Sequence, residues 1–266
     1  MPTTKRRLQC RRTSKLQPNQ HGPAPSREIE LALMGANRVH DALCAPPVQR
    51  IGQFEVASAV IPAHLVSGDF VLSFEVEDAE FLVLGDLMGK GLSAAMWLTH
   101  VVELIRRVCE REETLPAIMA RLNCEMYRSR VGVPLTSLFI AKLEPVQSRV
   151  TYSCAGCPAA FLLASDHQVI MLEHGGPVLG ALEPAAYHAE TIYVAPGQVL
   201  LAVSDGISEI HRGSHFELRP DRVVDHLRYS AGDTAESLVG SLVTRVRNTS
   251  SALIDDLSVM AIRRAG

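Results

Sequence analysis

Residues 70–91 of the chain have the sequence FVLSFEVEDAEFLVLGDLMGKG, and this stretch decides the expected fold. Apolar residues alternate with mostly polar ones over 70–76, which predicts a half-buried strand. A polar turn at 77–79 leads into the apolar run 81–84, which is typical of a buried strand. Two strands joined by such a short turn pair antiparallel. The stretch therefore predicts a hairpin that ends at a glycine-flanked aspartate, Asp86.

The same signals recur along the chain. Further hairpin strands are expected at 137–143 with 149–154, at 160–163 with 169–172, and at 191–194 with 199–203, followed by a last strand at 257–262. Helices are expected in consecutive pairs, near 97–108 and 115–128, then near 219–230 and 234–248. Because a helix does not follow each strand, an alternating α/β fold is excluded. We predict an α+β fold, an αββα sandwich of two antiparallel sheets packed face to face with helix pairs outside.

Charge is unevenly distributed along the 266 residues. The net charge is −3, yet residues 1–27 hold seven basic and no acidic side chains, which leaves about −10 on the rest. We expect 1–27 to be a disordered basic arm, 28–47 to contain a linker helix at 28–43, and 48–266 to form one domain. A nucleic acid, a lipid surface or an acidic protein could contact the arm, but a solvated tail is the simpler expectation and nucleic-acid binding is disfavoured.

No run of 18 apolar residues and no secretory signal is present, so we expect no membrane segment and a cytoplasmic location. The six cysteines are scattered, as in proteins that keep reduced thiols. A single CxxC at 154–157 lacks the second pair that a zinc site needs. The Gly85–Gly91 segment does not have phosphate-loop spacing.

Aspartates fall at the ends of expected strands, often beside glycine. Carboxylates in such positions can converge at one rim of a sheet, where they repel one another unless cations bind. All-oxygen ligand sets suit Mg²⁺ and Mn²⁺. Taken singly, each aspartate could instead be a turn residue, a cap or an exposed charge. The residues concerned are Asp69, Asp86, Asp205, Asp255 and Asp256.

The order of these motifs resembles metal-dependent protein phosphatases of the PPM (phosphatase 2C-like) type. The resemblance is to their bacterial branch of stage II sporulation and sigma-factor regulatory phosphatases, and it spans residues 30–263. That resemblance implies the αββα sandwich as well. The matching blocks are Pro62-Ala63 with Ser67–Phe70, Gly85–Gly91, Thr136–Phe139, Ala155-Gly156, Gly176–Gly180, Ser204–Glu209 and Asp255–Ser258.

The resemblance also implies a site and a reaction. Asp69, Asp86, Asp205 and Asp255 match the family's catalytic, metal-binding aspartates, and the carbonyl of Leu87 matches its backbone ligand. Two Mn²⁺ or Mg²⁺ ions, bridged by Asp86 and a water, would let that water attack phosphorus in line. The implied substrate is a phosphoserine or phosphothreonine on a regulatory partner of the anti-sigma-factor antagonist type.

Three departures from the family pattern concern substrate fit and loop shape. Ser67 replaces a glycine, Leu72 replaces a frequent second aspartate, and Cys157 replaces a histidine. They leave open a catalytically weak or inactive phosphatase-like module that binds a regulatory partner. The expected helix at 28–43 could pair with a second copy of the chain or with a regulator.

Overall fold

The computed structural model describes residues 27–63, 66–89, 91–156, 159–209, 220–230, 232–249, 253 and 255–266. The expected basic arm therefore lies outside the described residues, except for Arg27, which begins the first helix. The helices are α1 (Arg27–Leu43), α2 (Leu92–Cys109), α3 (Leu115–Tyr127), α4 (Gly206–Glu209), α5 (Pro220–Tyr229) and α6 (Ala235–Thr249). The strands are β1 (Val48–Ile51), β2 (Phe54–Ile61), β3 (Asp69–Val76), β4 (Ala79–Leu87), β5 (Thr136–Glu144), β6 (Arg149–Ala155), β7 (Ala159–Leu163), β8 (Val169–Met171), β9 (Gly175–Gly176), β10 (Glu190–Tyr193), β11 (Val199–Val203) and β12 (Leu257–Arg264).

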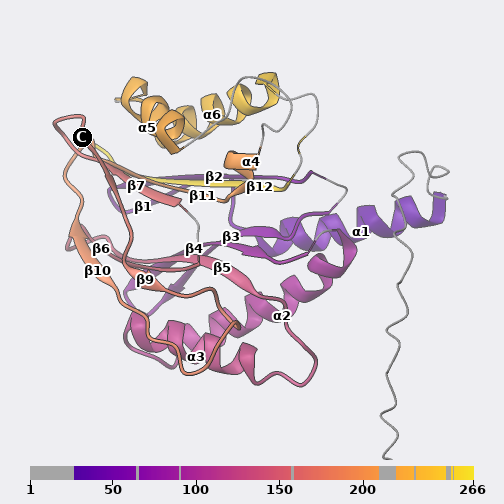
Figure 1. The fold of residues 1–266 in the computed structure, drawn as a ribbon. Coiled ribbons are helices and arrows are strands. Elements are labelled where there is room, and N and C mark those ends of the chain that lie inside the picture. Colours follow the sequence, from indigo (N-terminus) through magenta and orange to yellow (C-terminus); the bar gives the residue numbers. More distant parts are fainter. Residues whose placement is uncertain are drawn as a thin grey trace, which may run out of the picture.

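The strands form two sheets that pack face to face (Figure 1). Sheet A has the order β1-β2-β12-β11-β7-β8, and sheet B has the order β10-β6-β5-β4-β3 with β9 paired to β6. All pairings are antiparallel except that of β9 with β6. Helices α5 and α6 cover the outer face of sheet A, and α2 and α3 cover that of sheet B. The predicted αββα sandwich is confirmed.

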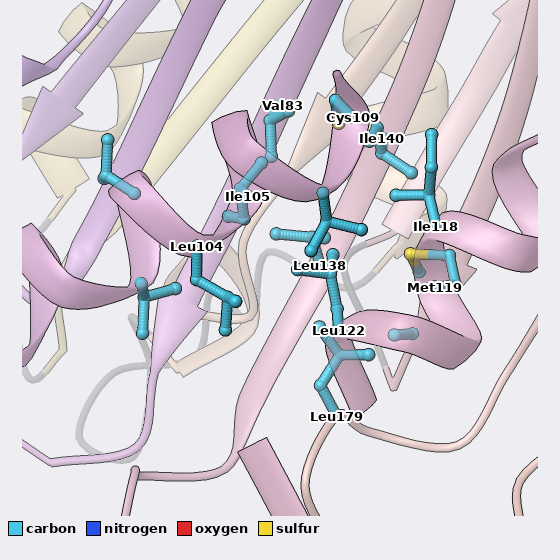
Figure 2. Close-up of a cluster of buried hydrophobic side chains, with 14 of the residues drawn as sticks. Val83, Leu104, Ile105, Cys109, Ile118, Met119, Leu122, Leu138, Ile140 and Leu179 are labelled. Carbon is cyan, nitrogen blue, oxygen red and sulfur yellow. The ribbon is translucent and has the colours of Figure 1, made fainter. Parts of the chain in front are cut away.

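Apolar side chains fill each gap between the layers. One cluster lies between the two sheets, one between sheet A and its helices, and one between sheet B and its helices (Figure 2 shows the last). Within β3, Val71 belongs to the cluster between the sheets, whereas Phe70 and Leu72 face the helices. The start of β3 is thus buried on both faces, unlike the half-buried strand expected from its alternation, because helices cover the sheet's outer side.

Local signals place the helices of sheet B. In α3, the Thr114 side chain accepts a hydrogen bond from the backbone of Ala117 at 3.4 Å, the expected contact of an N-terminal cap. In α2, buried Leu98, Val101 and Ile105 repeat at helical spacing and face the sheet. None of the helices in the described part of the chain is both long and apolar enough to cross a membrane.

The expected hairpin of 191–194 with 199–203 is wrong. β10 pairs with β6 in sheet B, whereas β11 pairs with β7 and β12 in sheet A. The turn at 195–197 therefore carries the chain from one sheet to the other. A short turn reverses the chain in either case. Its sequence therefore does not show whether the two flanking strands pair with each other or belong to different sheets. The strand β1 was not expected from the sequence.

Candidate metal centre

The first two predicted aspartates face each other across neighbouring strands. Asp69 is the first residue of β3, and it is directly opposite Asp86 near the end of β4. Asp69 is 2% exposed, while Asp86 is half-buried. Among the described residues, none donates a hydrogen bond to Oδ2 of Asp69, although this atom is buried. A buried carboxylate oxygen without a donor is energetically unfavourable unless something else satisfies it.

Burial and mutual repulsion raise the pKa values of both carboxyls. For Asp86 the pKa rises to about 6, first because of burial and next because of the charge of Asp205, with Asp255 and Asp256 adding to it. For Asp69 the pKa rises well above its ordinary value, first because of burial and next because of Asp86. Carboxylates that destabilise one another's charge form a site that favours a bound cation.

The other two aspartates come from sheet A. Asp205 follows the end of β11 and is exposed, and Asp255 precedes β12 and is half-buried. The adjacent residues of the two strands are tied together, because the backbone of Ser204 donates to the Ser258 carbonyl and that of Ser258 donates to the Ser204 hydroxyl, each at 2.9 Å. β12 also contacts β3 and β4 across the sandwich. Residues far apart in the sequence are therefore brought to one rim.

Two glycines fit this rim closely. A Cβ on Gly68 would lie 3.0 Å from the carbonyl oxygen of Leu87 and 3.2 Å from the Cβ of Ala94. A Cβ on Gly206 would overlap the carbonyl of Asp256. Only hydrogen fits at Gly206, whereas a methyl group at Gly68 would crowd its neighbours. The Leu87 carbonyl, predicted as a backbone ligand, thus lies against Gly68, the residue before Asp69.

Asp256 has a structural role that sequence reasoning missed. Its two carboxylate oxygens accept backbone hydrogen bonds from Ala63 and Gly68, both at 2.7 Å. The side chain is 6% exposed. It anchors the segment that leads into Asp69. The Asp-Asp pair in the sequence signalled an acidic site without showing which member does which task.

Two of the three departures from the family pattern lie at residues that the structure describes, and both have a local explanation. The Ser67 hydroxyl accepts a hydrogen bond from the backbone of Asp69 at 3.0 Å, so this serine helps to hold the strand start. Leu72 is fully buried in the cluster between sheet B and its helices, where a carboxylate would be unfavourable. Cys157 lies outside the described residues.

The donor chemistry at the rim fits a hard divalent cation. All candidate donors are oxygens, and one of them, Oδ2 of Asp69, is buried with no hydrogen-bond partner in the described part of the chain. Across the described ranges, no group of three or more acidic, histidine or cysteine side chains is already gathered closely enough to hold a metal ion. The carboxylates therefore lie within electrostatic reach of one another without forming a closed cage.

The sandwich with an acidic rim defines the chain as a phosphatase 2C-type domain. Residues 77–265 match the family model of Stage II sporulation protein E (SpoIIE), so the chain belongs to this family. The phosphoserine phosphatase RsbU of Bacillus subtilis (strain 168) is 22% identical over 241 residues, which cover 89% of this chain and 71% of RsbU. These matches confirm the family and the phosphatase class that the motifs predict.

Solved structures show the same fold. The SiaA-PP2C domain of Pseudomonas aeruginosa superposes with a TM-score of 0.76 at 17% identity, covering 90% of this chain and 98% of that domain. RsbX in complex with magnesium gives a TM-score of 0.61 at 17% identity, covering 81% of this chain and 97% of RsbX. At these identities the likeness concerns the fold.

Proposed function

We propose that the chain is a metal-dependent protein phosphatase that hydrolyses phosphoserine or phosphothreonine on a regulatory protein. The observation that carries this proposal is the directly opposed pair Asp69 and Asp86, with raised pKa values and an unpartnered buried oxygen. Perturbed carboxyls gathered at a rim are typical of functional sites. Carboxylate oxygens in this arrangement are better suited to binding cations than to acting as a nucleophile.

The proposed metal ligands are the carboxylates of Asp69, Asp86, Asp205 and Asp255 and the carbonyl of Leu87, for two Mn²⁺ or Mg²⁺ ions. When bound, such ions would offset the carboxylate charge and lower the pKa of a water able to attack phosphorus. The chain's part is to aim the four carboxylates at one place, and because the pKa values of Asp69 and Asp86 are raised, loss of their protons would accompany cation binding. Asp256, Ser67 and the β11–β12 contacts supply that rigidity.

The proposed substrate is a phosphorylated antagonist of an anti-sigma factor. Two observations support a protein substrate. Asp205 is exposed, and Met88, two residues after Asp86, is 62% exposed, so the rim is accessible to a large surface. The relative RsbU is named a phosphoserine phosphatase, which agrees with a phosphorylated hydroxyl side chain. The domain bounds 48–266 and a cytoplasmic location stay predictions.

A second candidate function is a phosphatase-like module that binds a regulatory partner without turnover. The absence of a preassembled ligand group among the described side chains favours it. The retained aspartates and their raised pKa values argue against it, because a binding module has no need of buried, mutually repelling carboxyls.

The decisive experiment is hydrolysis of p-nitrophenyl phosphate and of phosphorylated candidate antagonists, with and without Mn²⁺. Turnover should require the metal and should be lost in Asp86→Asn and Asp205→Asn. Asp78→Asn is the matched control, because Asp78 is an exposed aspartate in the β3–β4 turn, at the opposite end of the same hairpin. Metal-loaded wild-type protein that is silent on both substrates would support the binding module instead.

Helix α1 is a proposed pairing surface for a second copy of the chain or for a regulator. Leu31, Met34 and Val39 are each more than half exposed on it. Such an apolar stripe is usually covered in the working assembly. If the wild-type protein dimerises through α1, we expect the double variant Leu31→Glu with Met34→Glu to sediment as a monomer, with a lower sedimentation coefficient. A wild-type protein that is monomeric at all concentrations would contradict self-pairing.

A further inference from the structure

The last turn of α1 is attached to the strand that begins with Asp69. Nε2 of His40 lies 2.8 Å from the main-chain oxygen of Asp69, and the backbone of Ala45 donates to the carbonyl of Val71 at 2.7 Å. His40 is 5% exposed. Because a carbonyl oxygen only accepts, Nε2 carries the ring proton in this contact. The imidazole therefore joins α1 to a proposed metal ligand by a buried hydrogen bond.

The thiol of Cys44 packs against the same ring, with its Sγ 3.9 Å from Nε2. Its Sγ is 3.6 Å from Nδ1 of His40, one helical turn away. Burial raises the pKa of the Cys44 thiol to about 11, so it stays protonated at neutral pH and can donate to Nδ1. The carboxylate of Asp41 lies 3.8 Å from Nδ1, but its side chain is 82% exposed and faces water. The thiol therefore contacts both ring nitrogens, and it is the Asp69 carbonyl that favours the tautomer with the proton on Nε2.

A cavity lies beside the contact between α1 and the start of β3. The cavity, of about 540 Å³, is lined by residues of α1, β2 and α6, and His40, Cys44, Ser67 and Val71 are among them. Where side chains do not fill the space around a strand end, directional hydrogen bonds fix its backbone. Among the described residues, His40 and Ser67 make the two hydrogen bonds to the Asp69 main chain beyond the β3–β4 ladder. Removing the imidazole would leave the Ser67 contact alone.

We propose that His40 is a positioning residue, whose Nε2–H holds the main chain of Asp69 so that its carboxylate is aimed for metal binding, with Cys44 packing against the ring. This inference rests on the proposed metal-dependent function. One oxygen of the carboxylate, Oδ2, has no donor among the described residues, while the side chains of Ser204 and Ser258 lie close to the carboxyl and partly offset the rise of its pKa caused by burial. The backbone contact of His40 acts together with these serines in setting the direction of the carboxylate. Groups that orient a metal ligand without touching the metal typically lower metal affinity by about 10- to 100-fold when they are removed.

The chain offers a matched control in His226. This histidine is 6% exposed, and its Nε2 lies 3.0 Å from the Ser241 hydroxyl, between α5 and α6. Replacing either histidine by leucine removes a buried, hydrogen-bonded ring from the same fold. Only the His40 replacement should alter the metal site. The comparison separates positioning from a general loss of stability.

The experiment is titration of the metal-free full chain with Mn²⁺, with free Mn²⁺ measured by electron paramagnetic resonance. His40→Leu should raise the Mn²⁺ dissociation constant by about 10- to 100-fold. His40→Gln, whose amide can donate from a position near that of Nε2, should recover most of the affinity. Cys44→Ala should cause a smaller loss than His40→Leu. His226→Leu should bind Mn²⁺ like wild type, and KM for p-nitrophenyl phosphate at saturating Mn²⁺ should not change in His40→Leu.

Each outcome decides a different question. Equal Mn²⁺ affinity in wild type and His40→Leu overturns the inference and leaves the proposed function intact. A folded His40→Gln as weak as His40→Leu also overturns it, because the donor would then not matter. If wild type binds no Mn²⁺, the proposed function itself fails. If His40→Leu does not fold, His40→Asn, whose shorter amide does not reach the carbonyl, replaces it in the same comparison with His40→Gln.

Discussion

Asp69 and Asp256 are two buried carboxylates at the same rim, and the protein treats them in opposite ways. Both oxygens of Asp256 accept backbone hydrogen bonds at 2.7 Å. Asp69 has an oxygen with no donor among the described residues, and burial and Asp86 raise its pKa. A carboxylate satisfied by backbone stabilises the fold, whereas one left unsatisfied is available to a ligand. The difference separates a structural acid from a functional one.

Replacing Asp69 should produce the largest effect on activity. We expect Asp69→Asn to lower turnover by about 1,000-fold, because several kcal/mol of charge stabilisation at the metal depend on such ligands. The metal-free variant should be at least as stable as wild type, since a buried charge that repels Asp86 is gone. Steady-state kinetics and thermal unfolding measure the two effects. Wild-type turnover with unchanged Mn²⁺ dependence would contradict the proposed role.

Replacing Asp256 should lower stability more than turnover, which is the opposite of the result expected for Asp69. Asp256→Ala leaves the backbone N–H groups of Ala63 and Gly68 without their acceptor. We expect the free energy of unfolding to fall by about 3 kcal/mol, as when two hydrogen bonds to a charged group are lost. Turnover at saturating Mn²⁺ should fall far less than in Asp69→Asn. Urea denaturation tests this, and a loss of activity with no loss of stability would show that Asp256 is a ligand.

The raised pKa of Asp86 predicts an unusual dependence of stability on pH. Between the ordinary value of 3.8 and about 6, the folded metal-free protein keeps a proton that the unfolded chain releases. Its free energy of unfolding should therefore fall as the pH rises through this range, by roughly 3 kcal/mol at most from this group. The difference between wild type and Asp86→Asn measures this effect together with the accompanying change in the pKa of Asp69. Mn²⁺ should restore stability at pH 7.5 and bind more weakly below pH about 6. A difference that does not vary with pH would contradict the raised pKa.

The smallest predicted effect concerns the contact between Gly68 and Leu87. A methyl group on Gly68 would press on the Leu87 carbonyl and on Ala94, so Gly68→Ala should lower stability by about 1 kcal/mol and weaken Mn²⁺ binding. Gly240→Ala is the control, because nothing lies within 4 Å of its added Cβ in helix α6. That substitution should stabilise the protein by up to about 1 kcal/mol. Equal effects of the two substitutions would show that the Leu87 carbonyl is not confined by Gly68.

The layers of the fold followed from local sequence patterns, but the membership of strands in sheets did not. The hairpin β3–β4 and the helix pairs were predictable because alternation and helical spacing involve neighbours in the chain. The separation of β10 from β11 was not, because strand pairing depends on long-range contacts. Residues 69, 86, 205 and 255 were expected at one rim from strand ends and from the family resemblance. The pKa shifts of Asp69 and Asp86 show that these carboxyls influence one another.

The roles of His40 and Asp256 required the tertiary structure. His40 is 29 residues from Asp69, and Asp256 is 188 residues from Gly68, so no local spacing indicates either contact. A histidine in an expected linker helix and the second member of an acidic pair look unremarkable in a sequence. Among the side chains of α1 that the structure describes, His40 is the buried one, and this burial is visible only in the structure.

The sequence by itself determined the secondary structure of the layers, the family and the supply of aspartates at strand ends, because these depend on residue type and short-range order. The tertiary structure decided which aspartate is satisfied by backbone, which is left with an open oxygen, and which distant side chain holds it. Those distinctions arise from hydrogen bonds between residues far apart in the chain. Their strength depends on burial, which exists only once the two sheets have packed.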